Sequence, residues 1–139
     1  MRLGLTACLN RFLGCDLNSV LSSATQADLT SIHSSEENQF VTDLSDGRRF
    51  WLGGKVGWSW SDGTPWDYQN WGPGSPSGVY QGQVEDCIEN VASIYGEGQE
   101  GTWNDRGCNN IENSDLGYIC KAFNQGEKAF WSIGLMCEN

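Results

Sequence analysis

Hydrophobic residues recur three or four positions apart between residues 5 and 24, which is the period of an amphipathic helix. A short extended segment is predicted next, at residues 27–32. Its apolar residues Leu29 and Ile32 are expected to face a core. The chain therefore begins with one predicted helix and one predicted strand.

A second helix is predicted to begin after Ser34. The Ser34 side chain can cap the first turn, and Glu37, three residues later, is the matching partner of a capping box. The expected buried stripe consists of Phe40, Val41 and Leu44. The turn-forming residues 46–47 should end this helix.

Short strands dominate the remaining pattern, because runs of large apolar residues alternate with glycine and polar residues. Such runs occupy residues 50–53, 56–60, 87–92, 102–103 and 116–120. Between residues 72 and 82 the chain is rich in glycine, proline and serine, which predicts a long loop. Long loops inside compact domains are usually functional or disordered. Two helices followed by short strands predict an α+β domain.

Composition places this chain among secreted, disulfide-containing domains. At 139 residues it fits one domain, which buries roughly two-thirds of its unfolded surface. Six cysteines in so short a chain favour an oxidising, extracellular setting. The alternative is reduced cysteines buried as small hydrophobes. Zinc is disfavoured, because the chain has no Cys-x-x-Cys pair and its only histidine is His33.

The charge balance excludes several partners. With 18 acidic and 8 basic residues, the net charge of -10 should repel nucleic acid and anionic membranes. The sequence contains no run of eighteen apolar residues, so it predicts no membrane span. Residues 1–26 are interpreted as an atypical N-terminal segment, either a signal peptide or a first helix. Residues 123–139 are interpreted as a C-terminal tail.

Residues 85–120 carry the candidate chemistry. Carboxylates, an amide and three cysteines alternate around a tryptophan that we expect to be exposed: Glu85, Asp86, Cys87, Trp103, Asn104, Asp105, Cys108 and Cys120. Hard cations such as calcium take six to eight oxygen ligands and need them on a rigid frame. This stretch predicts one wall of such a cage, held by disulfides.

With these residues laid out, the segment 27–122 resembles the C-type lectin-like domain. The resemblance rests on motifs that keep one order along the chain: Ala27 to Ile32, Glu36-Glu37-Asn38, Trp51-Leu52-Gly53, Trp60 to Pro65, Asn70-Trp71, Glu85-Asp86-Cys87, Trp103-Asn104-Asp105, Cys108 and Tyr118 to Lys121. It implies a double-loop α+β fold with two helices, short antiparallel strands and a long ligand loop.

The resemblance also implies two disulfides. One joins Cys87 to Cys108, and the other joins Cys120 to a cysteine on the first helix. The position where the family carries that last cysteine is Ser22 here. The candidate partner is therefore Cys15, seven residues earlier.

That second pairing has a geometric difficulty. On a helix, seven residues span ~10 Å, whereas disulfides require Cα atoms within about 7 Å. Cys15 reaches Cys120 only if the first helix is displaced or ends differently. Pairings that use Cys8 or Cys137 stay open, since six cysteines allow fifteen connectivities.

The resemblance further implies a calcium-assisted carbohydrate site. Sugar-binding members hold calcium with a Glu-Pro-Asn or Gln-Pro-Asp triplet, which here reads Ser75-Pro76-Ser77. The matching ligands are Glu85, Asn104 and Asp105, and the same set with Ser75 and Ser77 would contact the sugar. The serine side chain is short and its hydroxyl is uncharged, so the dependence of sugar binding on calcium should be weakened. The family also shapes this loop with a cis bond before its proline, and Pro76 is the candidate.

We therefore expect an extracellular module that recognises carbohydrate or a glycoprotein. The alternative is a calcium-independent lectin-like domain that binds a protein or another non-sugar ligand. Tyr80 and Trp66 are candidates for stacking on a sugar ring. Most of the other tryptophans are interpreted as core residues: Trp51, Trp58, Trp60 and Trp71.

Catalysis is not expected. Nucleophilic or general acid–base chemistry needs a base poised beside a nucleophile. The sequence places His33 at a helix entrance, away from any serine motif. The carboxylates Asp86 and Glu89 lie on one predicted strand, at a spacing that does not suit a glycosidase pair.

Overall fold

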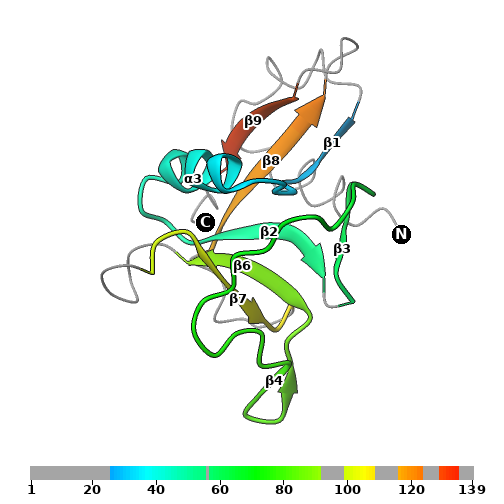
Figure 1. Ribbon diagram of the computed structural model, residues 1–139, viewed down its shortest axis with the longest axis vertical. Coiled ribbons are helices and arrows are strands. Elements are labelled where there is room, and N and C mark those ends of the chain that lie inside the picture. Colours follow the sequence, from blue (N-terminus) through cyan, green and yellow to red (C-terminus); the bar gives the residue numbers. More distant parts are fainter. Residues whose placement is uncertain (1–25, 56, 92–98, 109–115, 124–128, 135–139) are drawn as a thin grey trace, which may run out of the picture.

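The computed structural model describes residues 26–55, 57–91, 99–108, 116–123 and 129–134. In these residues one helix accompanies nine strands (Figure 1). The elements are β1 (Gln26–Leu29), α3 (Ser35–Leu44), β2 (Phe50–Lys55), β3 (Ser59–Trp60), β4 (Val79–Tyr80), β5 (Gln83–Val84), β6 (Cys87–Val91), β7 (Thr102–Arg106), β8 (Gly117–Phe123) and β9 (Ala129–Gly134). The α+β class predicted from the sequence is confirmed, and the predicted helix at residues 5–24 lies outside the described residues.

Strand β8 organises the main sheet, whose order is β1-β8-β2-β6-β7. The start of β8 pairs in parallel with β2, at Phe50 with Gly117, and its later part pairs antiparallel with β1 and β9. In Figure 1, β1, β8 and β9 form the upper part of the molecule, and β2, β6 and β7 form the lower part. Strand β9 lies within the segment interpreted as a tail, where the sequence shows no clear period, and the sequence analysis did not predict it.

Helix α3 begins where the capping pattern predicts. The Ser34 side chain accepts a hydrogen bond from the backbone N–H of Glu37 at 3.1 Å. The Glu37 carboxylate in turn accepts from the backbone N–H of His33 and pairs with Lys121 at 2.6 Å. The capping glutamate thus ties the helix start to β8. The helix ends at Leu44, before Asp46, as predicted.

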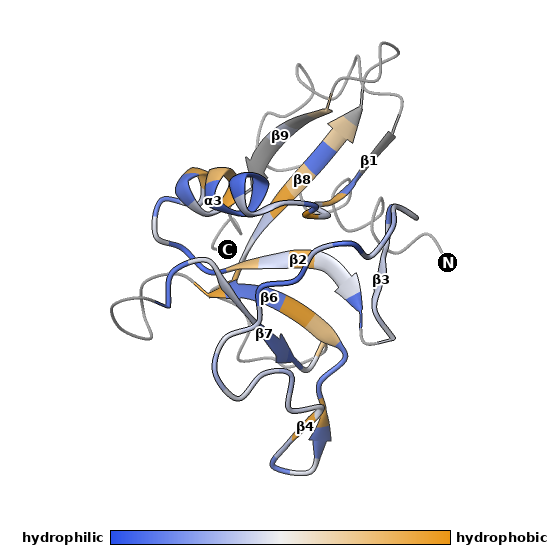
Figure 2. Ribbon diagram, in the orientation of Figure 1, coloured by the Kyte–Doolittle hydropathy of each residue, from blue (hydrophilic) through white to orange (hydrophobic). Residues whose placement is uncertain are grey.

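The buried stripe of α3 differs from the predicted one. Val41 is fully buried and Leu44 is partly buried, but Phe40 is 48% exposed and packs edge-on against Trp131 of β9. Asn38 is buried in its place, because its amide satisfies the backbone carbonyl of Gly101. Figure 2 shows the resulting alternation of hydrophilic and hydrophobic positions along α3.

The core lies between α3 and the sheet. Its buried members come from the helix and from five of the strands or their connections: Ile32, Val41, Phe50, Leu52, Trp60, Ile88, Trp103 and Ile119. Leu29, predicted to face the core, is partly buried against Cys120 in a smaller cluster. Burial of aliphatic and aromatic side chains of this size is the main stabilising term of such a domain.

Strand β2 needs glycine where the end of β1 approaches it closely. A Cβ atom at Gly53 would lie 2.6 Å from the carbonyl oxygen of Leu29. The strand predicted at residues 56–60 is shorter than expected. Gly57 and Trp58 adopt positive φ angles in a tight turn, so only Ser59 and Trp60 pair with β2.

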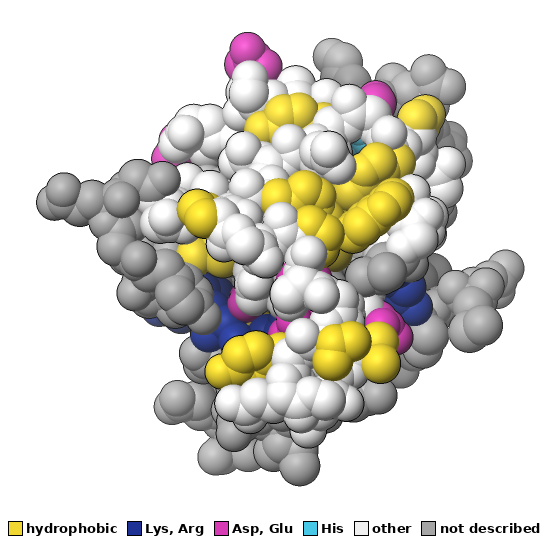
Figure 3. Space-filling view, turned by 60° about the horizontal axis from the view of Figure 1, so that its bottom comes forward, with side chains coloured by type: hydrophobic (Ala, Val, Ile, Leu, Met, Phe, Trp, Pro, Cys, Tyr) yellow, Lys and Arg dark blue, Asp and Glu magenta, His cyan; other side chains and the backbone are white. Residues whose placement is uncertain are grey.

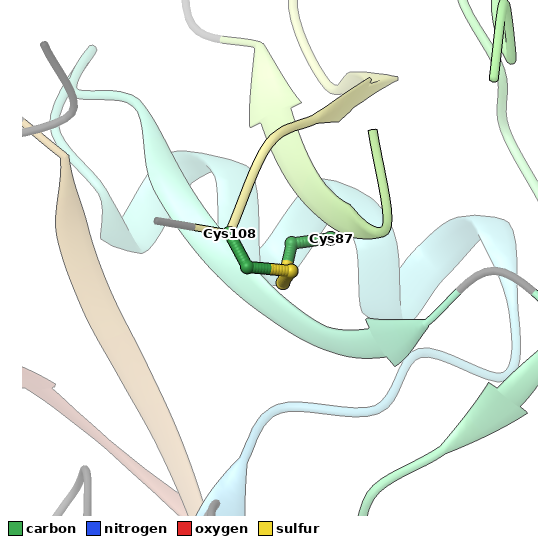
Figure 4. The surroundings of a disulfide bond; sticks show 2 residues. All are labelled: Cys87 and Cys108. Carbon is green, nitrogen blue, oxygen red and sulfur yellow. A yellow bond between two sulfur atoms is a disulfide. The ribbon is translucent and has the colours of Figure 1, made fainter. Parts of the chain in front are cut away.

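The Cys87–Cys108 disulfide implied by the resemblance is present, with Cα atoms 5.2 Å apart (Figure 4). It joins the start of β6 to the segment that follows β7. Cys120 is also disulfide-bonded. The predicted partner, Cys15, and the alternatives Cys8 and Cys137 lie outside the described residues.

Candidate functional site

The long loop is attached to the free edge of β7. Trp71 forms a parallel bridge with Trp103, in which the Trp103 N–H donates to the Asn70 carbonyl and the Gly72 N–H donates to the Trp103 carbonyl. The Asn70 side chain adds a hydrogen bond of 2.8 Å to the carbonyl of Gly101. From this anchor the loop runs alongside β7, which brings residues 75–78 next to residues 104–105.

All five residues predicted for the site come together in two neighbouring sets of hydrogen bonds, which we call the loop network. The Ser75 hydroxyl donates to Asn104 Oδ1 at 2.8 Å, and the Ser77 hydroxyl donates to Glu85 Oε2 at 2.7 Å. The backbone N–H of Ser77 donates to Asp105 Oδ1 at 2.9 Å. The Ser75–Asn104 pair is 29 positions apart in the sequence, so these contacts exist only because the loop follows β7.

A small hairpin projects beyond this network, formed by β4 and β5. Gln81 and Gly82 both have positive φ angles, as a two-residue type I′ turn requires. Glu85 is held at the base of the hairpin, because its backbone N–H donates to the Gly78 carbonyl at 3.0 Å. The hairpin was predicted only as loop, since no hydrophobic pattern marks it.

Val79, Tyr80 and Val84 on this hairpin are 56%, 62% and 63% exposed. Tyr80 therefore offers an open aromatic surface. On the face in Figure 3, hydrophobic side chains gather in the middle, with acidic and basic side chains below them.

Glu89 supports the site from its buried side by holding Asn104. The sequence did not indicate this role. Its Oε1 accepts from the Asn104 Nδ2 at 2.9 Å, and its Oε2 lies 2.5 Å from Arg49 Nη2. Glu89 is fully buried and Arg49 is 9% exposed. Arg106 lies 3.6 Å from the same carboxylate. The two arginines explain how a carboxylate can remain buried at this position.

The residues present do not fit a calcium ion well. Calcium takes six to eight oxygens, mostly from carboxylates, carbonyls and water. Among the five predicted site residues the carboxylates are Glu85 and Asp105, and Asp105 uses both oxygens to accept the backbone N–H groups of Ser77 and Gly78. The nearby Glu89 carboxylate is already paired with Arg49 and Asn104. Within the described residues, no group of three or more histidine, cysteine, aspartate or glutamate side chains could hold a metal.

The tryptophans pack around the loop anchor, but two of them differ from expectation. Trp103, expected to be exposed, is fully buried, and Trp58, expected in the core, is 39% exposed. Trp58 contacts Trp66 and Trp71, with ring centroids 5.7 and 5.1 Å apart. Trp66 stacks on the buried Trp60 at 4.5 Å, which commits one face of its ring to packing.

Tyr68 packs edge-on against Trp103, and burial raises the pKa of its phenol. Trp51 and Trp60 are buried, as predicted, and Trp71 is partly buried. The aromatic cluster is therefore mainly a support for the loop.

A serine, a histidine and an aspartate lie in line elsewhere. His33 Nε2 is 3.1 Å from Ser31 Oγ, and His33 Nδ1 donates to Asp67 Oδ1 at 2.6 Å, which lowers the pKa of Asp67. The sequence indicated that His33 lies away from any serine motif, and in the fold its ring contacts the hydroxyl of the single serine Ser31. Ser31 is fully buried, and its hydroxyl donates to Asp62 at 2.5 Å rather than facing a substrate. This arrangement holds the loop at residues 61–67 against the connection between β1 and α3 and does not present a nucleophile.

Three proteins illustrate what this chain is similar to. A protein called lectin from Pleurodeles waltl is 34% identical over 105 residues, which cover 68% of this chain and 55% of that protein. The low affinity immunoglobulin epsilon Fc receptor of Mus musculus is 37% identical over 91 residues, covering 62% of this chain and 25% of the receptor. Ladderlectin of Oncorhynchus mykiss is 36% identical over 94 residues, covering 60% and 46%. The chain thus spans between a quarter and about half of the length of these relatives.

Among solved structures, the cow C-type carbohydrate-recognition domain of CD23, determined in the presence of a GlcNAc2Man3 oligosaccharide, is 34% identical to this chain. The alignment has a TM-score of 0.48 and covers 59% of this chain and 60% of that one. No helix in the described part of this chain is long and apolar enough to cross a membrane. The family profile described as Lectin C-type domain matches residues 22–122, which include the loop network and the Cys87–Cys108 disulfide. The chain therefore belongs to the C-type lectin domain family.

Proposed function

We propose that this chain is an extracellular carbohydrate-recognition module whose ligand binds at the outer side of the network formed by residues 75–78, 85 and 104–105. The observation that carries this proposal is the convergence of Ser75, Ser77, Glu85 and Asn104 at one place on the surface. Hydroxyl, carboxylate and amide groups are the side chains that exchange hydrogen bonds with sugar hydroxyls. Membership of a family of binding modules, rather than enzymes, agrees with this role.

The polar atoms of the site are accessible in part. Ser77 is exposed, and Ser75 and Glu85 are partly exposed. The open ring of Tyr80 on the adjacent hairpin offers a surface for the apolar face of a pyranose. In this proposal calcium contributes little, since serines replace the carboxylate and amide of the family triplet. The Cys87–Cys108 disulfide supports an oxidising, extracellular location.

A second candidate function is recognition of a protein without calcium. The exposed Val79, Tyr80 and Val84 favour it, because apolar and aromatic side chains of this kind form the centres of protein interfaces. One of the similar proteins is named as an immunoglobulin epsilon Fc receptor. A protein partner would rest on the hairpin rather than on the serine network.

Calorimetric titration with methyl α-mannoside, methyl β-galactoside and N-acetylglucosamine tests the first candidate. Glu85→Ala and Asn104→Ala should each weaken binding, and Glu85→Ala by about tenfold or more, because a hydrogen bond to a charged group contributes ~1.5–3 kcal/mol. Asp86→Ala is the matched control, since it removes an exposed carboxylate next to the site. Binding that is equally strong in all three variants would contradict the proposed site.

A serum glycoprotein fraction, applied before and after enzymatic removal of its glycans, separates the two candidates. Carbohydrate recognition predicts that retention is lost with the glycans. Protein recognition predicts that retention survives deglycosylation and is lost in Val79→Ser and Tyr80→Ser, while Glu85→Ala retains it.

A further inference from the structure

We infer that the loop carrying Ser75 and Ser77 is held against the strand-side acceptors by hydrogen bonds that its own hydroxyl and backbone N–H groups donate. These hydrogen bonds take over the role that a divalent cation would have. This inference deepens the proposed function and rests on it for the choice of loop. It follows from the direction of each hydrogen bond, beginning at the buried carboxylate of Glu89.

The orientation of the Asn104 amide is fixed by Glu89. A carboxylate can only accept hydrogen bonds, so the Asn104 atom 2.9 Å from Glu89 Oε1 must be the Nδ2 donor. The carbonyl oxygen Oδ1 of Asn104 then faces Ser75, and this contact of 2.8 Å requires the Ser75 hydroxyl to be the donor. The buried pair of Glu89 with Arg49 therefore determines where the Ser75 proton points.

The remaining contacts have the same polarity. Glu85 is a carboxylate in the network, so the Ser77 hydroxyl must donate to it across 2.7 Å. Asp105 is fully buried and accepts two backbone N–H groups, from Ser77 at 2.9 Å and from Gly78 at 2.6 Å. Each of these four contacts, from the two serine hydroxyls and the two backbone N–H groups, thus runs from a proton on the loop to an oxygen of Asn104, Glu85 or Asp105.

This polarity is the reverse of what a bound cation needs. A cation requires the loop to offer lone pairs toward the same point as the frame oxygens. Here the loop offers protons, and the backbone N–H groups of Ser77 and Gly78 have no lone pair to offer. Glu85 keeps one oxygen, Oε1, without a partner among the described residues, and a single carboxylate oxygen beside two neutral hydroxyls is a poor calcium site.

The consequence is a recognition surface whose conformation does not require a bound cation. Ser75 and Ser77 already use their protons, so their oxygens remain as acceptors together with Glu85 Oε1. A carbohydrate would therefore meet acceptors suited to its hydroxyl protons and bind by direct hydrogen bonds, with an affinity that does not respond to calcium.

Thermal unfolding and amide exchange of the oxidised chain test this inference without any sugar. The melting temperature should be the same in calcium chloride and in excess EDTA. The amides of Ser77 and Gly78 should exchange slowly in EDTA and faster in the double variant S75A/S77A. A melting temperature of the unaltered chain that rises by several degrees with calcium, or a Ser77 amide that exchanges freely in EDTA, would overturn the inference.

A gain of function supplies the converse test. In S75E/S77N the loop again offers carboxylate and amide oxygens, so calcium at a hundred times its dissociation constant should raise the melting temperature by roughly 5–15 °C. The control S59E adds a charge at an exposed serine of β3 and should show no response to calcium. A calcium response that is absent from S75E/S77N would contradict the argument from loop polarity. Calcium insensitivity combined with no binding to any of the three sugars would overturn the carbohydrate proposal and leave this inference standing.

Discussion

Asn104 donates a hydrogen bond of 2.9 Å to Glu89, and through it the surface network is joined to a buried ion pair. The two residues face each other across β6 and β7 in the strand register. Through Asn104, Glu89 thereby links Arg49, the residue before β2, to the loop at Ser75. The stability of the sheet and the geometry of the candidate site depend on the same carboxylate.

Replacement of Glu89 by alanine should therefore be severe. Removal of one partner of a buried pair leaves a charge without compensation and typically costs about 3–5 kcal/mol. We expect a loss of this size in the free energy of unfolding, measured by urea denaturation. The control Asp43→Ala removes an exposed carboxylate of α3 that accepts from Gln39 on the same helix, and it should cost less than about 1 kcal/mol. Equal effects of the two variants would contradict this role of Glu89.

Asp105→Ala should release the loop while the sheet persists. It leaves the N–H groups of Ser77 and Gly78 without their acceptor, at a cost of roughly 2–4 kcal/mol. Hydrogen exchange should show faster exchange at these two amides and unchanged protection in β8. Uniform loss of protection across the sheet would instead indicate global destabilisation. Asp105→Asn, which keeps one acceptor oxygen, should have a smaller effect.

Titration of the Asp28 carboxyl should make the free energy of unfolding depend on pH. Burial raises the pKa of Asp28 above 3.8, against the opposing hydrogen bonds from Ser61 and from the Leu29 N–H. A carboxyl with a raised folded pKa favours the folded state when protonated, so its contribution declines as the pH rises through its unfolded and then its folded pKa.

Asp28→Asn should accordingly raise the melting temperature at pH 7 and have little effect at pH 3, where the aspartate is already neutral. The asparagine Oδ1 can still accept both hydrogen bonds, because both are made to the same oxygen of Asp28. Calorimetric scans at the two pH values measure the difference. A stabilisation of equal size at both would show that the charge is not its cause.

Phe40→Ala should cost less than a core substitution. Phe40 is 48% exposed, and its main contact is the ring of Trp131, with centroids 5.0 Å apart. An aromatic pair of this kind contributes about 0.5–1.5 kcal/mol, whereas truncation of a buried phenylalanine costs about 3–5 kcal/mol. The matched comparison is Phe50→Ala, at a fully buried position of β2. Urea denaturation should separate the two variants by at least ~1.5 kcal/mol.

Features with a local cause were predictable from the sequence. Ser34 and Glu37 form the helix start because capping depends on residues three positions apart. Strand β2 follows from the compact apolar run at residues 50–53, which is typical of a short buried strand. Contacts between segments far apart in the sequence were harder to predict. Phe40 was assigned to the core because a helical stripe says which face is apolar, without saying what covers each position along it.

The amino-acid sequence by itself determined the α+β class, the capped helix, the family resemblance and which side chains were candidates for the site. Only the tertiary structure decided how those side chains face one another. It aligned the loop along β7, buried Trp103, exposed Trp58, and placed Glu89 beneath Asn104. The physical reason is that hydrogen-bond direction depends on the partner: Ser75 and Ser77 read as poor metal ligands in the sequence, and they act as proton donors only because carboxylate and amide oxygens lie within 3 Å of them.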